Sequence, residues 1–375
     1  MIIAAGGTGG HLYPGVALAR EFERQVPGSD TMFVGTTRGL ETSVVPKEGF
    51  ELITIAARGV MGKGMGGALQ GLAVVPLGVA QCLAVCRKRR PDLAIGVGGY
   101  TSPPLILAAF LLGIKRVIVE PNVYPGVANR VLSPIANRVF VSFADAVPYF
   151  GSSKTLIVGT PIRREFLHAP ILPGGGPADA PPGPTAGAEA RGLTVLVLGG
   201  SQGARSINRA MIAAVPALVA AHHGLRVIHQ TGARDHEEVA AAYRNMESAG
   251  QAAQMEVVPF LYDMPRAFRQ ADLIVSRSGA TTVAEITACG KPAVLIPFPH
   301  AIHGHQDRNA RVLEGAGAAQ VIVDARLSGE LLAGAISALL ARPDRLREMA
   351  RCSKSLGQAD AAERIVSECR ALVKG

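Results

Sequence analysis

Two glycines and a serine in the stretch TVLVLGGSQGARS, residues 194–206, have a spacing that supports two different chemistries. Gly199, Ser201 and Gly203 match G-x-S-x-G, the turn that presents a nucleophilic serine between a strand and a helix in α/β-hydrolases. The same glycines leave backbone N–H groups uncovered at the start of a helix, where they attract a phosphate. The first interpretation predicts a serine hydrolase, whereas the second predicts a protein that binds a phosphorylated ligand.

A second glycine turn, GGTGGH at residues 6–11, follows the apolar run that opens the chain. It lacks the G-x-G-x-x-G spacing because residue 12 is leucine, and no Walker lysine follows, which disfavours a dinucleotide site or a P-loop. An anion or a sugar hydroxyl can still approach the bare backbone, and a purely structural strand-to-helix turn is the alternative. His11 begins the next helix, where the helix dipole favours a neutral imidazole that accepts a proton; capping or packing is its alternative role.

The segment SRSGATTVAE, residues 276–285, joins a turn of small residues to a carboxylate about two helical turns later. Ser278, Thr281 and Thr282 are suited to holding a phosphate. Glu285 can accept two hydrogen bonds from a ribose diol, and a solvated helix glutamate is the alternative. This segment therefore favours a nucleotide ligand.

A further polar segment, PHAIHGHQDRNA at residues 299–310, follows an apolar strand and is expected to be a loop. It supplies His300, His303, His305, Gln306, Asp307 and Asn309. Zinc requires ligands fixed on one element, so a hydrogen-bonding rim is favoured over a metal site. The chain also has no D-x-D pair for a metal-held nucleotide sugar. A sugar transferase of this sequence is expected to use helix N-termini and Arg163 against the departing diphosphate.

The hydrolase interpretation requires an acid and then a histidine after Ser201, and Asp272 with His300 satisfies that order. It leaves the turn at residues 6–11 and the segment 276–285 without a role. The phosphate interpretation accounts for both of them.

The composition describes a globular α/β protein with many tight turns. Of 375 residues, 48% are hydrophobic, 18% are charged and 44 are glycine, and this length predicts two domains. The net charge of +9 suits a polyanion, an anionic membrane or a phosphorylated substrate. Nucleic acid is the weakest of these partners, because the basic run RKRR at residues 87–90 has no accompanying strip of aromatic residues.

The five cysteines show no C-x-x-C spacing, and the amino-terminal sequence does not resemble a secretory signal, so a reducing cytosolic compartment is expected. One apolar segment, residues 66–86, complicates this expectation. A helix partly packed on a core is favoured over a membrane span, because Gln70, Pro76 and Gln81 interrupt the segment. A third alternative is a helix lying in the surface of an anionic bilayer beside the RKRR run.

The chain repeats one structural plan, since strand, glycine turn and helix occur at its start and again at residues 193–223. Residues 93–120 and 273–297 repeat a strand, helix, strand unit. We therefore expect two Rossmann-like, doubly wound parallel-sheet domains that face each other across a cleft. The predicted divisions are an N-terminal domain at 1–160, a linker with a Pro/Gly-rich loop at 161–192, a C-terminal domain at 193–345, and terminal helices at 346–375.

Seven stretches occur in a distinctive order along nearly the whole chain: GGTGGHLYPGVALA, GVGGYTSPP, EPN, GTPIRREF, GGSQGARSIN, PFLYDMPRAFRQADLIVSRSGATTVAE and HQDRNA. In this order they resemble the bacterial MurG family of UDP-N-acetylglucosamine:undecaprenyl-pyrophosphoryl-muramoyl-pentapeptide N-acetylglucosaminyltransferases. The resemblance implies the GT-B fold, with the last helix returning to the N-terminal domain. It also implies inverting transfer of N-acetylglucosamine to the 4-hydroxyl of lipid I, which gives lipid II for peptidoglycan synthesis, with no cofactor and no metal.

The resemblance also implies roles for particular residues. Ser201 and Gln202 would face the phosphates, Leu261 the uracil, Glu285 the ribose and Gln306 the sugar hydroxyls. His11 is the candidate base, and Glu120 is a candidate helper. The other implied substrate-binding residues are Thr8, Gly9, Gly10, Asn122, Arg163, Ala280, Thr281, Thr282, Val283 and Ala284.

This chain departs from the family pattern at two places. Val119, Glu120, Pro121 and Asn122 stand where the family commonly has His-Glu-Gln-Asn. The chain also has no tryptophan for the membrane patch, which would use Leu69, Leu72, Val74, Val75 and Leu77 instead. The implied location is peripheral, on the cytoplasmic face of the inner membrane, with cell-wall and division proteins as further candidate partners.

Overall fold

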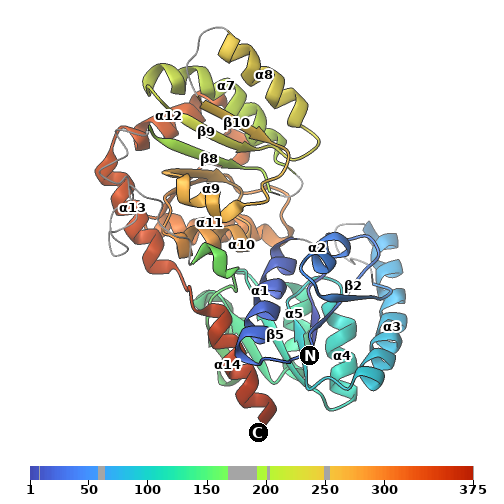
Figure 1. The fold of residues 1–375 in the computed structure, drawn as a ribbon. Helices are drawn as coiled ribbons and strands as arrows, with labels where there is room; N and C mark the ends of the chain where they lie inside the picture. Colours follow the sequence, from blue (N-terminus) through green and yellow to red (C-terminus); the bar gives the residue numbers. More distant parts are fainter. Residues whose placement is uncertain (8, 58–63, 168–191, 201–202, 249–253, 375) are drawn as a thin grey trace. The chain divides into compact units, whose positions relative to one another are not determined.

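The computed structural model describes residues 1–7, 9–57, 64–167, 192–200, 203–248 and 254–374 (Figure 1). The chain divides into two compact units. The first unit comprises Met1–Arg164 and Gln358–Gly375, and the second comprises Glu165–Gly357. Each unit has its own sheet and its own hydrophobic core.

The first unit alternates strands and helices along the chain. Its strands are β1 (Ile2–Ala4), β2 (Met32–Gly35), β3 (Glu51–Thr54), β4 (Leu93–Gly96), β5 (Lys115–Glu120), β6 (Arg138–Val141) and β7 (Thr155–Ile157). Its helices are α1 (Gly9–Gln25), α2 (Glu41–Lys47), α3 (Gly64–Arg89), α4 (Ser102–Leu111), α5 (Val127–Leu132) and α14 (Ala361–Lys374). Short 3₁₀ helices are η1 (Ser133–Ile135), η2 (Ala144–Tyr149) and η3 (Ser152–Lys154), with η4 (Arg164–Phe166) at the division between the units.

The second unit repeats the alternation. Its strands are β8 (Thr194–Leu198), β9 (Arg226–Gln230), β10 (Gln254–Val258), β11 (Leu273–Ser276), β12 (Ala293–Leu295) and β13 (Ala319–Val321). Its helices are α7 (Arg205–Ala221), α8 (His236–Ser248), α9 (Met264–Gln270), α10 (Ala280–Cys289), α11 (His305–Gly315), α12 (Gly329–Leu340) and α13 (Pro343–Leu356), with 3₁₀ helices η5 (Ile302–Gly304) and η6 (Asp324–Arg326).

Both sheets are built from parallel strand pairs. The first sheet has the order β3-β2-β1-β4-β5-β6-β7, and the second has the order β10-β9-β8-β11-β12-β13. Successive strands are added toward one edge of the sheet up to β3 and then toward the other edge from β4 onward, so the strand order reverses between β1 and β4. In the second unit the same reversal lies between β8 and β11. The carboxyl ends of strands at such a switch point are where open α/β sheets bind ligands. The predicted pair of doubly wound domains is confirmed.

The strands of the first sheet read as continuous apolar runs because helices cover both of its faces. Ile3 packs with residues of α1 and α14 on one face, and Ile2 packs with residues of α3 and α4 on the other. The helix α14 lies beside α1, where Ile365 and Cys369 are fully buried (Figure 1). The last helix of the chain is therefore part of the first unit, whereas α13 belongs to the second.

The apolar segment 66–86 lies within α3. Cys82 and Cys86 of this helix are buried in the core of the first unit, whereas Leu77 is 55% exposed. The favoured prediction, a helix partly packed on a core, is confirmed. None of the helices in the described ranges has the length and apolar character that crossing a bilayer requires. The Pro/Gly-rich segment 169–192 falls outside the described residues except for Gly192.

Candidate functional site

The switch point of the second sheet brings two of the sequence motifs together. The turn beginning at Gly199 follows β8, and the turn at 277–279 follows the neighbouring strand β11. Ser201 and Gln202, the predicted phosphate contacts, lie outside the described residues. The residues from Ala280 through Thr282, Val283 and Ala284 to Glu285 form the first part of α10.

The amino terminus of α10 has no side-chain cap, because its N-cap residue is Gly279. The first amides of a helix have no partner within the helix, and they carry the positive end of its dipole. Thr281 and Glu285 follow one another on one face of α10, and each is 8% exposed. Glu285 is therefore not the solvated helix glutamate of the alternative interpretation.

The turn after β11 is tied to the start of α11. The Ser278 hydroxyl donates to the Gln306 carbonyl oxygen over 2.7 Å, and Asn309 Nδ2 donates to the Ser278 carbonyl over 3.1 Å. Ser278 thus links the two turns, and its role in holding phosphate stays a prediction. The predicted loop at 299–310 is wrong from His305 onward, since α11 begins there.

Gln306 is fixed in the first turn of α11. Its Oε1 accepts a hydrogen bond of 3.0 Å from the backbone N–H of Phe298. This contact orients the carboxamide and directs the Nε2 group away from Phe298. Among the side chains the structure describes, no group of three or more histidine, cysteine, aspartate or glutamate residues could hold a metal ion.

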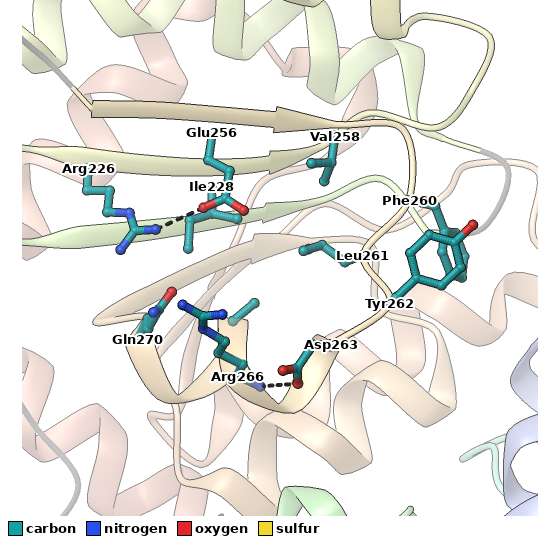
Figure 2. A pocket seen from close by; sticks show the side chains of 11 residues that line it. Arg226, Ile228, Glu256, Val258, Phe260, Leu261, Tyr262, Asp263, Arg266 and Gln270 are labelled. Carbon is teal, nitrogen blue, oxygen red and sulfur yellow. Dashed lines mark hydrogen bonds and ion pairs between the residues drawn. The ribbon is translucent and has the colours of Figure 1, made fainter. Parts of the chain in front are cut away.

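Leu261 lies in the segment between β10 and α9 and lines a hollow of about 260 Å³ (Figure 2). The walls combine apolar side chains with an ion pair of 2.8 Å between Arg226 and Glu256. Phe260 and Tyr262 flank Leu261 and meet edge to face, with ring centroids 5.1 Å apart. The arrangement places apolar surface beside polar groups.

The switch point of the first sheet is already occupied by side chains of the protein. The Gly6 N–H donates to Thr101 Oγ1 over 3.0 Å, and the Gly7 N–H donates to Glu41 Oε2 over 3.3 Å. Glu41 is 1% exposed, and its Oε1 also accepts from the N–H and hydroxyl of Thr36. The expectation of bare amides is therefore wrong at Gly6 and Gly7. Thr8 lies outside the described residues, and Gly9 and Gly10 begin α1.

His11 lies against the second glycine turn of this sheet. A Cβ atom on Gly98 would stand 2.8 Å from His11 Cδ2 and 2.9 Å from Nε2, and the Gly98 φ of +111° also favours glycine. Burial lowers the pKa of His11 to about 4. The imidazole is therefore neutral near pH 7 and able to accept a proton, for a reason that the sequence did not supply.

Glu120 organises the loop that contains Asn122. Its carboxylate is 1% exposed and accepts from the N–H and Nδ2 of Asn122, from the Gly126 N–H and from Asn129 Nδ2, all between 2.9 and 3.1 Å. Burial raises the pKa of Glu120, and these four donors oppose the rise. Glu120 thus positions Asn122 directly. Arg163, the remaining candidate, stacks its guanidinium 5.0 Å from the ring centroid of Tyr13 in α1.

The geometry excludes the hydrolase triad. Asp272 precedes β11 at the amino end of the sheet, where its Oδ2 accepts a hydrogen bond of 2.8 Å from the Thr194 N–H. Gly199 and Gly200, which precede Ser201 in the sequence, follow the carboxyl end of the adjacent parallel strand β8. Asp272 and Gly200 are therefore at opposite ends of the sheet.

Two family models cover most of the chain. The glycosyltransferase family 28 N-terminal domain matches residues 1–141, and the family 28 C-terminal domain matches residues 194–365. Together with the two parallel sheets, these matches define the chain as a family 28 glycosyltransferase. More narrowly, the chain belongs to the MurG family within that class.

Three similar proteins illustrate this relationship. A Geobacter sulfurreducens protein named "UDP-N-acetylglucosamine--N-acetylmuramyl-(pentapeptide) pyrophosphoryl-undecaprenol N-acetylglucosamine transferase" is 44% identical, covering 98% of this chain and 97% of its own. A Syntrophus aciditrophicus protein of the same name is 43% identical, covering 100% and 99%. The crystal structure of Acinetobacter baumannii MurG superposes with a TM-score of 0.74 at 27% identity, covering 99% of each chain.

Proposed function

We propose that this protein transfers N-acetylglucosamine from UDP-N-acetylglucosamine to the 4-hydroxyl of the lipid-linked muramoyl pentapeptide, with inversion at the anomeric carbon. The observation that carries the proposal is identity of 40 to 44% over nearly full length with transferases of that name. The placement of the motifs at the two switch points supports it. Lipid I is the acceptor in this scheme, and lipid II is the product.

The second unit holds the donor in this proposal. The diphosphate is met by the uncapped amino terminus of α10 and by Ser201 and Gln202. Arg163, which belongs to the first unit, stays a prediction of the family resemblance. Glu285 accepts the ribose hydroxyls, and Gln306 binds the sugar through its Nε2 group. Leu261 contacts the uracil, a role that its place in the wall of the hollow supports.

The first unit binds the acceptor and supplies the base in this proposal. His11 takes the proton from the attacking hydroxyl, because its neutral imidazole is the protonation state that a base requires. Gly9, Gly10 and Thr8 lie beside it in the chain and contact the substrate. Asn122 binds substrate from the loop that Glu120 organises.

A membrane surface on the first unit completes the proposal. Leu77 on α3 and Phe110 and Leu111 on the adjoining α4 are 55%, 46% and 63% exposed. The exposed basic run at 87–90 ends the same α3. Apolar side chains beside basic ones suit peripheral attachment to an anionic membrane. Phe110 supplies an aromatic group that the sequence-based patch lacked.

The test of the proposal is transfer of radiolabel from UDP-N-acetylglucosamine to a lipid I analogue. Product carrying the label in a β linkage is expected. Transfer to a diacylglycerol instead, or binding of the donor with no turnover on any acceptor, would refute it.

A further inference from the structure

A cluster of three side chains at the carboxyl edge of the second sheet lies outside every role described above. Arg277 follows β11, Ser206 lies in the first turn of α7, and Asp324 begins η6 after β13. None of the three was singled out by the sequence patterns as a binding or catalytic residue. Asp324 belongs to none of the seven family stretches.

The three side chains form a closed ring of hydrogen bonds. Arg277 Nη1 donates to Asp324 Oδ1 over 2.5 Å, and Nη2 donates to Ser206 Oγ over 2.8 Å. The Ser206 hydroxyl in turn donates to the same Asp324 Oδ1 over 2.7 Å. Each of the three side chains is thus hydrogen-bonded to the other two, and this fixes the orientation of the guanidinium.

The guanidinium also reaches the connection that follows β12. Nη1 donates to the carbonyl oxygens of Ile296 and Pro297 over 3.1 and 3.2 Å, and the carbon of the guanidinium lies 5.4 Å from the ring centroid of Phe298. The cluster therefore joins the segments that leave four neighbouring strands, β8, β11, β12 and β13. These segments make up the edge where an α/β sheet binds its ligand.

Two paths lead from this cluster to proposed donor contacts. Phe298, beneath the guanidinium, donates its N–H to Gln306 Oε1. Arg277 itself stands directly before Ser278 and Gly279, which precede the first turn of α10. A change in the guanidinium position would therefore move both the Gln306 carboxamide and the amides of α10.

The ion pair differs from the surface pairs of the same unit. The side chains of Arg277 and Asp324 are 15% and 18% exposed, whereas those of Arg347 and Asp344 are 45% and 95% exposed. Exposed pairs are screened by water and contribute little, but a partly buried guanidinium that loses its carboxylate leaves an uncompensated charge.

We propose that Asp324 is a positioning residue for the donor site: it orients Arg277, which holds the α10 amino terminus and Gln306 in the arrangement that binds the nucleotide sugar. This inference rests on the proposed function of the second unit. It assigns Asp324 no contact with the substrate.

The test compares Asp324→Ala and Asp324→Asn with Asp344→Ala, which removes the exposed carboxylate of a matched pair in the same unit. Donor Kd is measured by calorimetry with UDP-N-acetylglucosamine, donor KM and kcat by label transfer, and folding by thermal unfolding. Asp324→Ala is expected to raise Kd and KM about tenfold, the effect of losing one hydrogen bond between the donor and a displaced Gln306 or α10 amide. Asp324→Asn, which keeps an oxygen acceptor, should recover part of the loss, and Asp344→Ala should match the wild type.

A wild-type Kd and KM for Asp324→Ala would overturn the inference. So would a lower unfolding temperature and a smaller active fraction with Kd unchanged, because that result describes a purely structural residue. A wild-type protein that binds no donor or transfers no label would instead refute the proposed function. The two failures are therefore distinguishable.

Discussion

Each unit has turns of small residues at the switch point of its sheet, and a turn of the first unit differs from one of the second in what bonds its amides. In the first unit, the amides of Gly6 and Gly7 are bonded to Thr101 and to the buried carboxylate of Glu41. In the second unit, α10 follows β11, the other strand of the switch point, and begins after Gly279 with no side-chain cap. A glycine-rich turn binds an external anion only where the protein has not supplied its own acceptor. In the proposed function the phosphates therefore bind to the second unit, and His11 is the candidate base of the first.

The largest expected effect is the loss of kcat when the candidate base of the first unit is removed. His11→Ala should lower kcat about 100- to 10,000-fold, the usual contribution of a positioned general base. Donor Kd should stay at the wild-type value, because the donor is held by the second unit. Steady-state label transfer and calorimetry measure the two quantities. Normal turnover would contradict the catalytic role and show that His11 only packs against Gly98.

The next largest effect concerns donor binding, which is proposed for the second unit. Glu285→Ala should weaken donor binding by about 1 to 3 kcal/mol, through loss of hydrogen bonds from the ribose to a carboxylate. Glu237→Ala is the control, since that side chain is 83% exposed at the start of α8 in the same unit. Calorimetry on both variants checks the prediction, and equal Kd values for the two would contradict it.

A third substitution tests the occupied turn. Glu41→Ala removes the acceptor of the Gly7 and Thr36 amides and should destabilise the protein by about 1 to 3 kcal/mol, the cost of leaving a buried donor unpaired. Chemical denaturation measures this loss. Donor Kd should be unaffected. A variant that binds UDP more tightly would show that the first turn, once vacated, is itself a nucleotide site.

The smallest effect concerns pH. The pKa of His11 is lowered to about 4 and that of His229 in the second unit to about 3, in both cases by burial. Between pH 6.5 and 4 the unfolded chain binds protons at these positions and the folded chain does not, so stability should fall as pH falls through this range. Thermal unfolding from pH 7 to 4 measures the trend, and His11→Gln should make it shallower. An unfolding temperature that rises toward pH 4 would contradict both shifts.

Sequence patterns predicted the architecture well because parallel strands covered on both faces leave continuous apolar runs, as in IIAA at residues 2–5 and TVLVL at 194–198. The same patterns placed Glu285 and Gln306 on the second unit. They could not identify Glu41 or Asp324, because each acts on residues distant in sequence. Ser206 and Asp324 are separated by 118 positions in the sequence, and no periodicity pairs them.

Local patterns also misjudged two segments for physical reasons. Histidines and a glycine suggested a loop at 299–310, but Asp307 in the first turn and the apolar residues of α11 support a helix from His305. The dipole argument for a neutral His11 reached the right protonation state, although burial is the cause in the folded chain. The helix is thus encoded in the segment itself, whereas the burial of His11 depends on tertiary contacts that its segment does not encode.

The central claim is that the second unit supplies the contacts to the diphosphate, the ribose and the sugar that are proposed for α10, Glu285 and Gln306. A crystal structure with UDP-N-acetylglucosamine tests it most directly. The account predicts the diphosphate at the first-turn amides of α10, the ribose hydroxyls at Glu285 and the sugar at Gln306. A diphosphate bound at the turn of Gly6 and Gly7, with the Glu41 carboxylate displaced, would contradict it.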